Sequence, residues 1–250
     1  MATTSVEQAL NRLRETRVWK SIFRRGPALT NRTRSIAVFG NLGLHLLPVK
    51  VREKSLAVRA TYYLGSISFF LFVLLAVTGV LLMLYYHPAV PDAYRDMKDL
   101  VYVVSNGVFL RNLHRLAAQA MVVAVFWHMF HVFYRGGYKP PHEFNWVVGV
   151  GLLLVTLFLS YTGYLLPWDQ LAFWAITVGT NIIGYVPLLG RPIRFLLLGG
   201  HIIGQNALLR FYVLHCVILP LAAVALIAVH FWRIQKDGGL TVRDDHERDE

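Results

Sequence analysis

Four histidines inside uncharged hydrophobic runs are the residues of this chain best placed to do chemistry. They form two pairs, His114 with His128 and His215 with His230, whose members are 14 and 15 residues apart. Four helical turns take about 14.4 residues, so each pair lies roughly on one helix face, about 21–22 Å apart along the axis. An imidazole without a partner is costly in hydrocarbon. Two helices with inward histidines at matching depths could therefore hold two haems, each iron bound by two imidazoles.

The composition predicts an all-α integral membrane protein. The 250 residues are 56% hydrophobic and only 16% charged. Crossing a hydrocarbon core takes about 20 apolar residues. Four stretches meet that length and predict a bundle of four transmembrane helices around two b-type haems: residues 62–86, 116–134, 146–167 and 211–232. A fifth stretch, 171–189, contains glycines and a proline and is interpreted as an interfacial helix and loop.

The charges predict the topology and three regions. Residues 1–61 form a basic N-terminal extension with a possible amphipathic helix over 5–23, residues 62–236 the dihaem domain, and residues 237–250 a charged tail. The positive-inside rule places the extension in the cytoplasm, and four spans return the C-terminus there. The net charge of +11 then indicates topology and attraction to membrane lipids, with no nucleic-acid partner expected.

The single cysteine, Cys216, excludes several metal and haem sites. One cysteine cannot form a disulfide within the chain, a cysteine-only zinc site or a CxxCH haem attachment. No covalent c-type haem is therefore predicted from that motif.

Glycine pairs in the first and third spans repeat the spacing of the histidines. Gly65 and Gly79 are 14 residues apart, as are Gly149 and Gly163. A helix glycine usually allows a neighbouring helix to approach closely. Here we expect the glycines to make room for a flat porphyrin. Pro220, five residues after His215, is expected to bend the fourth span and absorb the odd residue of the second histidine pair.

Haem propionates need cations near the membrane surface. Arg111, Arg115 and Arg210 are the predicted partners of the outer haem. The inner haem has Arg135, Lys139, Arg233 and Lys236 as candidates. Each of these cations has a simpler interpretation as a charge that snorkels to the interface. His131, three residues after His128, is a competing ligand, a propionate partner or a proton-uptake group.

Three segments resemble the cytochrome b family of quinol–cytochrome c (or plastocyanin) oxidoreductases. They are RNLHRLAAQAMVVAVFWH, TGYLLPWDQLAFWA and LLRFYVLHCVILPLAAVALIAVHFW. The wording PWDQ and the 15-residue spacing are similar to the cytochrome b6 branch, in which cytochrome b is split into two polypeptides. The resemblance covers roughly residues 62–236.

The resemblance implies a role for each matching residue. His114 and His215 would ligate a low-potential haem near the outer side, beside Arg111, and His128 and His230 a high-potential haem near the inner side. The four paired glycines match the family's haem-packing glycines. One wall of an outer quinol-oxidation pocket would comprise Gly163, Tyr164, Phe173, Trp174 and Ala175.

Three departures from the family pattern carry expectations of their own. The PEWY motif of the C-terminal half is absent, so a subunit IV-like polypeptide would complete the quinol pocket. Tyr63 stands where plastid-type members carry the cysteine of an extra covalent haem, so none is expected. His131 stands where many members have arginine, which leaves the inner propionate partner and quinone site open.

The sequence therefore predicts the dihaem cytochrome b subunit of a bc/b6f-type quinol oxidoreductase, a subunit of a translocase that is incomplete alone. Expected partners are a Rieske iron–sulfur protein, the C-terminal half of cytochrome b and a c-type cytochrome, in a dimeric complex. We expect a bacterial inner membrane, with a thylakoid membrane as the alternative. Two other functions stay open: a dihaem anchor of a quinone-linked dehydrogenase or hydrogenase, and a haem-free transporter or assembly subunit.

Overall fold

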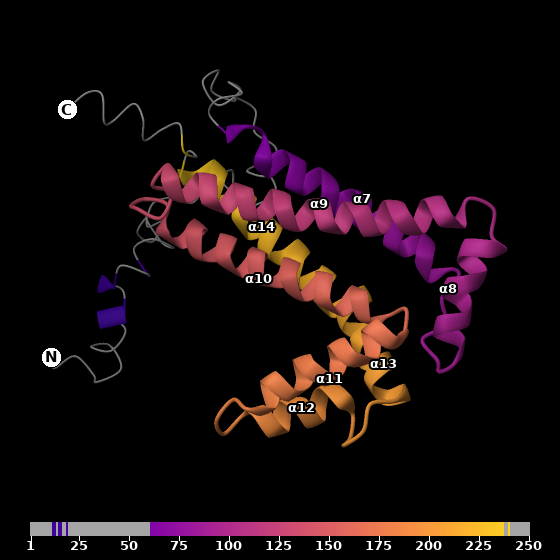
Figure 1. Ribbon diagram of the computed structural model, residues 1–250. Helices are drawn as coiled ribbons and strands as arrows, with labels where there is room; N and C mark the ends of the chain where they lie inside the picture. Colours follow the sequence, from indigo (N-terminus) through magenta and orange to yellow (C-terminus); the bar gives the residue numbers. More distant parts are fainter. Residues whose placement is uncertain (1–11, 14, 17–18, 20–60, 238–239, 241–250) are drawn as a thin grey trace, which may run out of the picture. The chain divides into compact units, whose positions relative to one another are not determined.

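The described part of the chain is built from helices. The computed structural model describes residues 12–13, 15–16, 19, 61–237 and 240 (Figure 1). The predicted amphipathic helix over 5–23 and the predicted tail over 237–250 lie almost wholly outside these residues. Nothing tests either prediction.

Four runs of helix are long and apolar enough to cross a membrane, and they confirm the predicted fold class. Three are single helices: α7 (Leu64–Met83), α9 (Gly107–Tyr134) and α10 (Glu143–Leu165). The fourth run, Gln205–Asp237, joins α13 (Gln205–Val213), the π-helical turn η1 (Leu214–Ile218) and α14 (Leu219–Asp237). The sequence prediction started the second span at residue 116, after the last arginine. The helix begins nine residues earlier because an arginine stem can lie along a helix while its charge reaches the surface.

A short amphipathic helix precedes α9. Helix α8 (Asp92–Tyr102) buries Ala93 and Leu100 and exposes Arg95, Lys98 and Asp99. The predicted spans leave residues 87–115 as a connection, and no helix was predicted there. Its apolar residues are few, but they fall on one face and are buried there, which gives the helix a packing surface.

Two further helices follow α10, and both are shorter than any of the candidate spans. Helix α11 (Gln170–Gly184) begins at Asp169, whose Oδ1 accepts a hydrogen bond of 2.8 Å from the backbone N–H of Ala172. Such a cap satisfies one of the free N–H groups at a helix start. Helix α12 (Gly190–Leu198) then doubles back. Neither helix is a candidate span, which agrees with the interfacial interpretation of residues 171–189.

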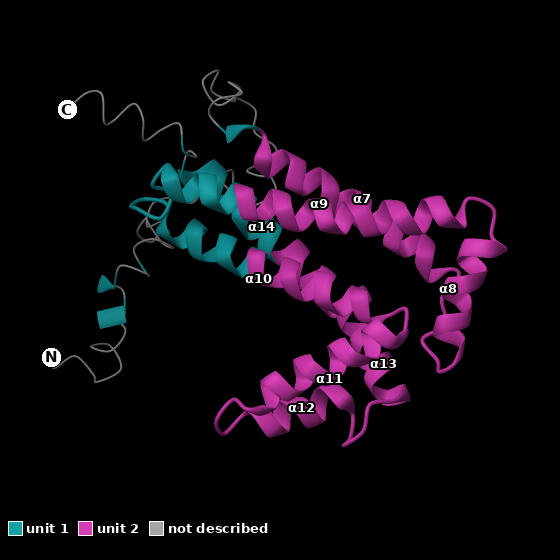
Figure 2. Ribbon diagram, in the orientation of Figure 1, with its two compact units in different colours: residues 1–62, 128–152, 226–250 teal, residues 63–127, 153–225 magenta. Residues whose placement is uncertain are grey.

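The chain divides into two compact units (Figure 2). Unit 1 contains residues 1–62, 128–152 and 226–250, and unit 2 contains residues 63–127 and 153–225. Helices α9, α10 and α14 each contribute segments to both units. The boundaries proposed from the sequence, at residues 61 and 236, stay a prediction.

The core of unit 2 joins α10 to the helices that follow it. Its fully buried side chains are Leu165, Ile176, Leu198, Ala207 and Phe211. A smaller cluster includes Tyr86, whose hydroxyl donates a 2.6 Å hydrogen bond to the carbonyl of Leu166. Burial raises the pKa of this tyrosine, which therefore keeps the proton it donates. This hydrogen bond ties the residues just after the first span to Leu166, which directly follows α10.

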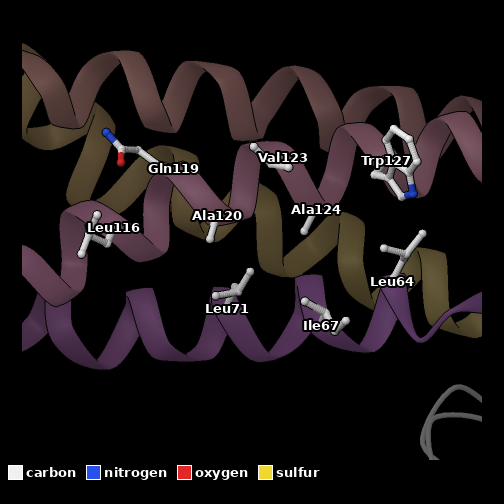
Figure 3. A pocket seen from close by; sticks show the side chains of 9 residues that line it. All are labelled: Leu64, Ile67, Leu71, Leu116, Gln119, Ala120, Val123, Ala124 and Trp127. Carbon is white, nitrogen blue, oxygen red and sulfur yellow. The ribbon is translucent and has the colours of Figure 1, made fainter.

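An apolar groove of about 550 Å³ runs between α7 and α9 in unit 2 (Figure 3). Gln119 is the single polar side chain in a lining that otherwise consists of Leu64, Ile67, Leu71, Leu116, Ala120, Val123, Ala124 and Trp127. None of the four paired histidines lines it. A groove without charged groups suits hydrocarbon chains, and it is not the candidate site.

Unit 1 contains a buried ion pair on the last turns of α14. The Arg233 guanidinium and the Asp237 carboxylate are 2.7 Å apart, and their side chains are 0% and 1% exposed. The guanidinium also lies 5.1 Å from the ring centre of Phe144. Removing one member of such a pair leaves the other charge buried, which is far more costly than removing both.

We expect Asp237→Asn to lower the free energy of unfolding by about 3–5 kcal/mol, because it replaces the buried carboxylate 2.7 Å from the Arg233 guanidinium with a neutral amide. The double variant Arg233→Met/Asp237→Leu should recover most of that loss. Denaturant unfolding of the purified protein in detergent measures both. Equal losses in the single and double variants would contradict this view of the pair.

Candidate haem sites

The first and third of the four histidines lie together in unit 2. Helix α9 positions His114 and the π turn η1 positions His215. Their ring centres are 6.3 Å apart and their planes meet at 79°. The structure thus brings together the two residues predicted as the outer pair.

The second and fourth histidines lie together in unit 1. His128 is on the last turns of α9 and His230 on α14. Their ring centres are 6.5 Å apart at an interplanar angle of 84°. The predicted inner pairing is therefore also the one that the structure contains.

Both separations fit two imidazoles that share one metal ion. An imidazole nitrogen binds a first-row metal at about 2.0–2.1 Å, and the ring centre lies about 1.1 Å further out, so a shared metal places two ring centres roughly 6.3 Å apart. The steep interplanar angles do not oppose this, because a ring can rotate about its metal–nitrogen bond without losing the ligand position.

The number of ligands favours haem over a bare metal ion. The described residues contain no group of three or more histidine, cysteine, aspartate or glutamate side chains that could hold a metal. A zinc ion takes four ligands, at least three of them from the protein. Haem iron needs only two axial ligands because the porphyrin supplies the other four. Two pairs of histidines thus match two bis-histidine haems.

Hydrogen bonds orient both outer rings. Nδ1 of His114 lies 2.8 Å from the Oγ1 of Thr78, and that hydroxyl donates to the carbonyl of Leu74 at 2.7 Å. Nδ1 of His215 lies 3.1 Å from the carbonyl oxygen of Leu159 and 3.3 Å from the Oγ1 of Thr162. A carbonyl only accepts, and the Thr78 hydroxyl has already given its proton. Both histidines therefore donate from Nδ1, which leaves the Nε2 lone pair for iron.

The sequence analysis missed both threonines. Each is buried, with 3% of its surface exposed, and each directly precedes a predicted haem-packing glycine. The repeated dipeptides Thr78-Gly79 and Thr162-Gly163 were the available signal. In isolation a threonine inside an apolar helix carries no information about a ligand, because it can bond to its own helix.

The glycines make room for the histidine rings. A Cβ at Gly163 would lie 2.5 Å from Cε1 of His215, and one at Gly79 would lie 3.3 Å from Cε1 of His114. At Gly149 the nearest atoms are Cε of Met129 at 3.7 Å and Cε1 of His230 at 3.9 Å, which are ordinary contacts. At Gly163 and Gly79 a side chain would therefore crowd a histidine ring. The predicted packing of all four glycines against a porphyrin stays a prediction.

A π turn accounts for the odd residue in the second histidine pair. The segment η1 contains His215 and bonds each N–H five residues back, so its turns hold an extra residue. The prediction was instead that a bend at Pro220 absorbs the odd residue. Proline has no N–H to give the carbonyl four residues earlier and crowds it, so the wider turn beside it relieves that contact. Because the π turn absorbs one residue, the 15-residue spacing of His215 and His230 corresponds to a 14-residue spacing in a regular α-helix.

The three predicted propionate partners have different surroundings. Nη1 of Arg210 donates to the carbonyl of Leu196 at 2.7 Å, so this guanidinium caps the C-terminal end of α12. Arg111 is half-buried and Arg115 exposed. Contacts of all three with propionates stay predictions. His131 meets the ring of Tyr62 edge to face, with centres 5.3 Å apart.

The residues predicted to wall a quinol pocket lie at the end of α10 and on α11. Tyr164, Phe173 and Trp174 are 53%, 42% and 59% exposed. The carbonyl of Ala175 accepts a 3.0 Å hydrogen bond from the Tyr161 hydroxyl. The three aromatic side chains thus offer apolar surface, and their role in a pocket stays a prediction.

The family model described as Cytochrome b/b6/petB matches residues 49–238. The chain belongs to the cytochrome b/b6 family. Cytochrome b6 of Heliobacterium mobile is 39% identical over 177 residues, which are 71% of this chain and 83% of that protein. Cytochrome b6 of Porphyra purpurea is 40% identical over 71% of this chain and 82% of its own length.

A solved structure extends the similarity to the fold. A chain of the "Hyperthermophilic respiratory Complex III" aligns with a TM-score of 0.66 and 28% identity, over 71% of this chain and 48% of that one. The present chain spans about half the length of that match. Membership in the family confirms the predicted resemblance and identifies a multi-pass membrane protein of electron transport that binds b-type haem.

We expect Gly163→Ala to lower the content of the outer haem severely, because its new methyl group would displace the ring of His215. Gly151→Ala is the matched control, since it lies on the same helix, is not one of the predicted haem-packing glycines, and its methyl group would make only an ordinary contact of 3.6 Å with Cδ1 of Leu226. The pyridine haemochrome assay measures haem per chain in both. Equal haem loss in the two variants would contradict the role given to Gly163.

Deleting Val217 should preserve binding of both haems, because it removes the extra residue of the π turn and leaves a regular helix. Deleting Ala225 from the regular part of α14 turns His230 by about 100° relative to His215 and should remove one haem. Haem content and the reduced-minus-oxidised spectrum report the difference. Loss of a haem from the Val217 deletion alone would refute this account of the spacing.

Proposed function

We propose that this chain is the dihaem cytochrome b subunit of a quinol:cytochrome c (bc/b6f-type) oxidoreductase. It would carry electrons across the membrane from an outer quinol-oxidation site to an inner quinone-reduction site. The observation that carries the proposal is the pair of metal-spaced histidine couples, one in each unit, on helices long enough to span a bilayer.

The chain's own residues define what each site does. His114 and His215 would hold the outer haem, and His128 and His230 the inner one. Each haem, when bound, supplies a one-electron carrier of b type. With both histidines of a pair bound to it, such a haem would transfer electrons and would not bind oxygen or substrate. Thr78, Thr162 and the carbonyl of Leu159 hold the outer imidazoles in the tautomer that ligation requires.

The proposal includes the partners expected from the resemblance. A subunit IV-like polypeptide would supply the C-terminal half of the cytochrome b core and complete the pocket beside Tyr164, Phe173 and Trp174. A Rieske iron–sulfur protein and a c-type cytochrome would accept electrons on the outer side, in a dimeric complex. The matches to cytochrome b6 proteins and to a chain of respiratory complex III support this assignment.

The test is purification of the native complex followed by quinol addition. We expect a Rieske-type EPR signal, b-haem bands that quinol reduces, and quinol-dependent reduction of a c-type cytochrome. His114→Ala should remove one b-haem and abolish quinone reduction at the inner site. His201→Ala, in an exposed loop, is the matched control and should keep both properties. A molybdenum or nickel subunit in place of the Rieske protein would favour a dehydrogenase or hydrogenase anchor.

A further inference from the structure

His230 of the inner pair differs at Nδ1 from both histidines of the outer pair. In the outer pair, Nδ1 of His114 and Nδ1 of His215 both have hydrogen-bond acceptors. In the inner pair, Nδ1 of His230 is buried and has no hydrogen-bond partner among the described residues. The structure thus gives chemically identical ligands two different surroundings.

Nδ1 of His215 has two acceptors on α10, the carbonyl of Leu159 at 3.1 Å and Oγ1 of Thr162 at 3.3 Å, and only the second depends on a side chain. Thr162 precedes Gly163, whose Cβ position is closest to Cε1 of His215. Fourteen residues earlier on the same helix, Val148 precedes Gly149, whose Cβ position lies 3.9 Å from Cε1 of His230. Val148 therefore has the same place toward His230 that Thr162 has toward His215. It is buried, with 7% of its surface exposed, and presents a methyl group in place of a hydroxyl.

A hydrogen bond at Nδ1 changes the ligand strength of the imidazole. Donation from Nδ1–H moves electron density toward Nε2 and raises the basicity of the ligand. A more basic ligand stabilises the more positive, oxidised iron, which lowers the reduction potential. A buried Nδ1–H without an acceptor has the opposite effect.

We propose that Thr78 and Thr162 are positioning residues that lower the reduction potential of the outer haem, and that Val148 keeps the inner potential higher by withholding an acceptor from His230. This inference rests on the proposed function, because it requires haem at both pairs. These three side chains would then favour electron transfer from the outer to the inner centre.

The test is potentiometric titration of the b-haem bands in the intact complex, with EPR of the oxidised haems. Thr78→Val should raise the outer midpoint and reduce the equilibrium constant for electron transfer to the inner haem about five- to tenfold, as for the loss of one hydrogen bond. Thr162→Val should shift the outer midpoint in the same direction but less, because the carbonyl of Leu159 still accepts from His215. The inner midpoint should not change. Thr162→Ser keeps a hydroxyl and serves as the matched control.

The reverse variant adds the missing acceptor. Val148→Thr is nearly isosteric, and its hydroxyl can donate to its own helix as Thr162 does to Phe158. It should lower the inner midpoint and leave the outer one unchanged. Because this variant adds an acceptor, it tests the effect of the Nδ1 hydrogen bond on the midpoint even if Thr162→Val fails to retain the outer haem.

Unchanged midpoints in Val148→Thr, or equal shifts in Thr162→Val and Thr162→Ser, would overturn the inference while leaving the proposed function intact. The absence of b-type haem from the wild-type complex would overturn the proposed function itself, and this inference with it. A shift confined to the targeted haem, with normal haem content, would support the assignment.

Discussion

An imidazole in hydrocarbon is costly unless its nitrogens have partners, and this cost organises the outer histidine pair. Water is not available in the membrane interior, so a lone histidine there carries a desolvation cost that only specific partners can offset. In the outer pair, one nitrogen of each ring donates to a threonine hydroxyl or a carbonyl. The other nitrogen has a lone pair that a metal can take. The close approach at Gly163 and the buried Thr78 and Thr162 all follow from the need to hold these rings.

The same requirement constrains the helices along their length. Two ligands on one helix have to face the same way at two depths, and an α-helix meets this condition at 14 residues but turns away at 15. Helix α9 has its two histidines 14 residues apart and is regular. The fourth span has His215 and His230 15 residues apart and contains a π turn at His215, beside a proline that cannot complete a regular turn. A local departure from α-helical geometry thus lies at a ligand, as π turns frequently do at functional sites.

Features that depend on composition and periodicity were predictable from the sequence. The four spans and the pairing of the histidines follow from hydrophobic length and helical spacing, and the structure contains both. The second span begins earlier than predicted, because arginine stems allow the helix to extend into the membrane interface. Helix α8 was missed because few apolar residues sufficed to pack it. Thr78, Thr162 and the π turn were missed for a different reason. Whether a threonine hydroxyl accepts from a histidine ring, and whether a helix shifts its backbone hydrogen bonds, depends on tertiary neighbours that spacing alone does not reveal.

Low-temperature EPR combined with haem quantification on the purified native complex tests the central claim most directly. Two bis-histidine sites predict two b-type haems for each copy of this chain, both six-coordinate and low-spin when oxidised. Fewer than two haems for each chain, or a high-spin signal from an iron with an open axial position, would contradict the assignment of His114, His128, His215 and His230 as paired ligands.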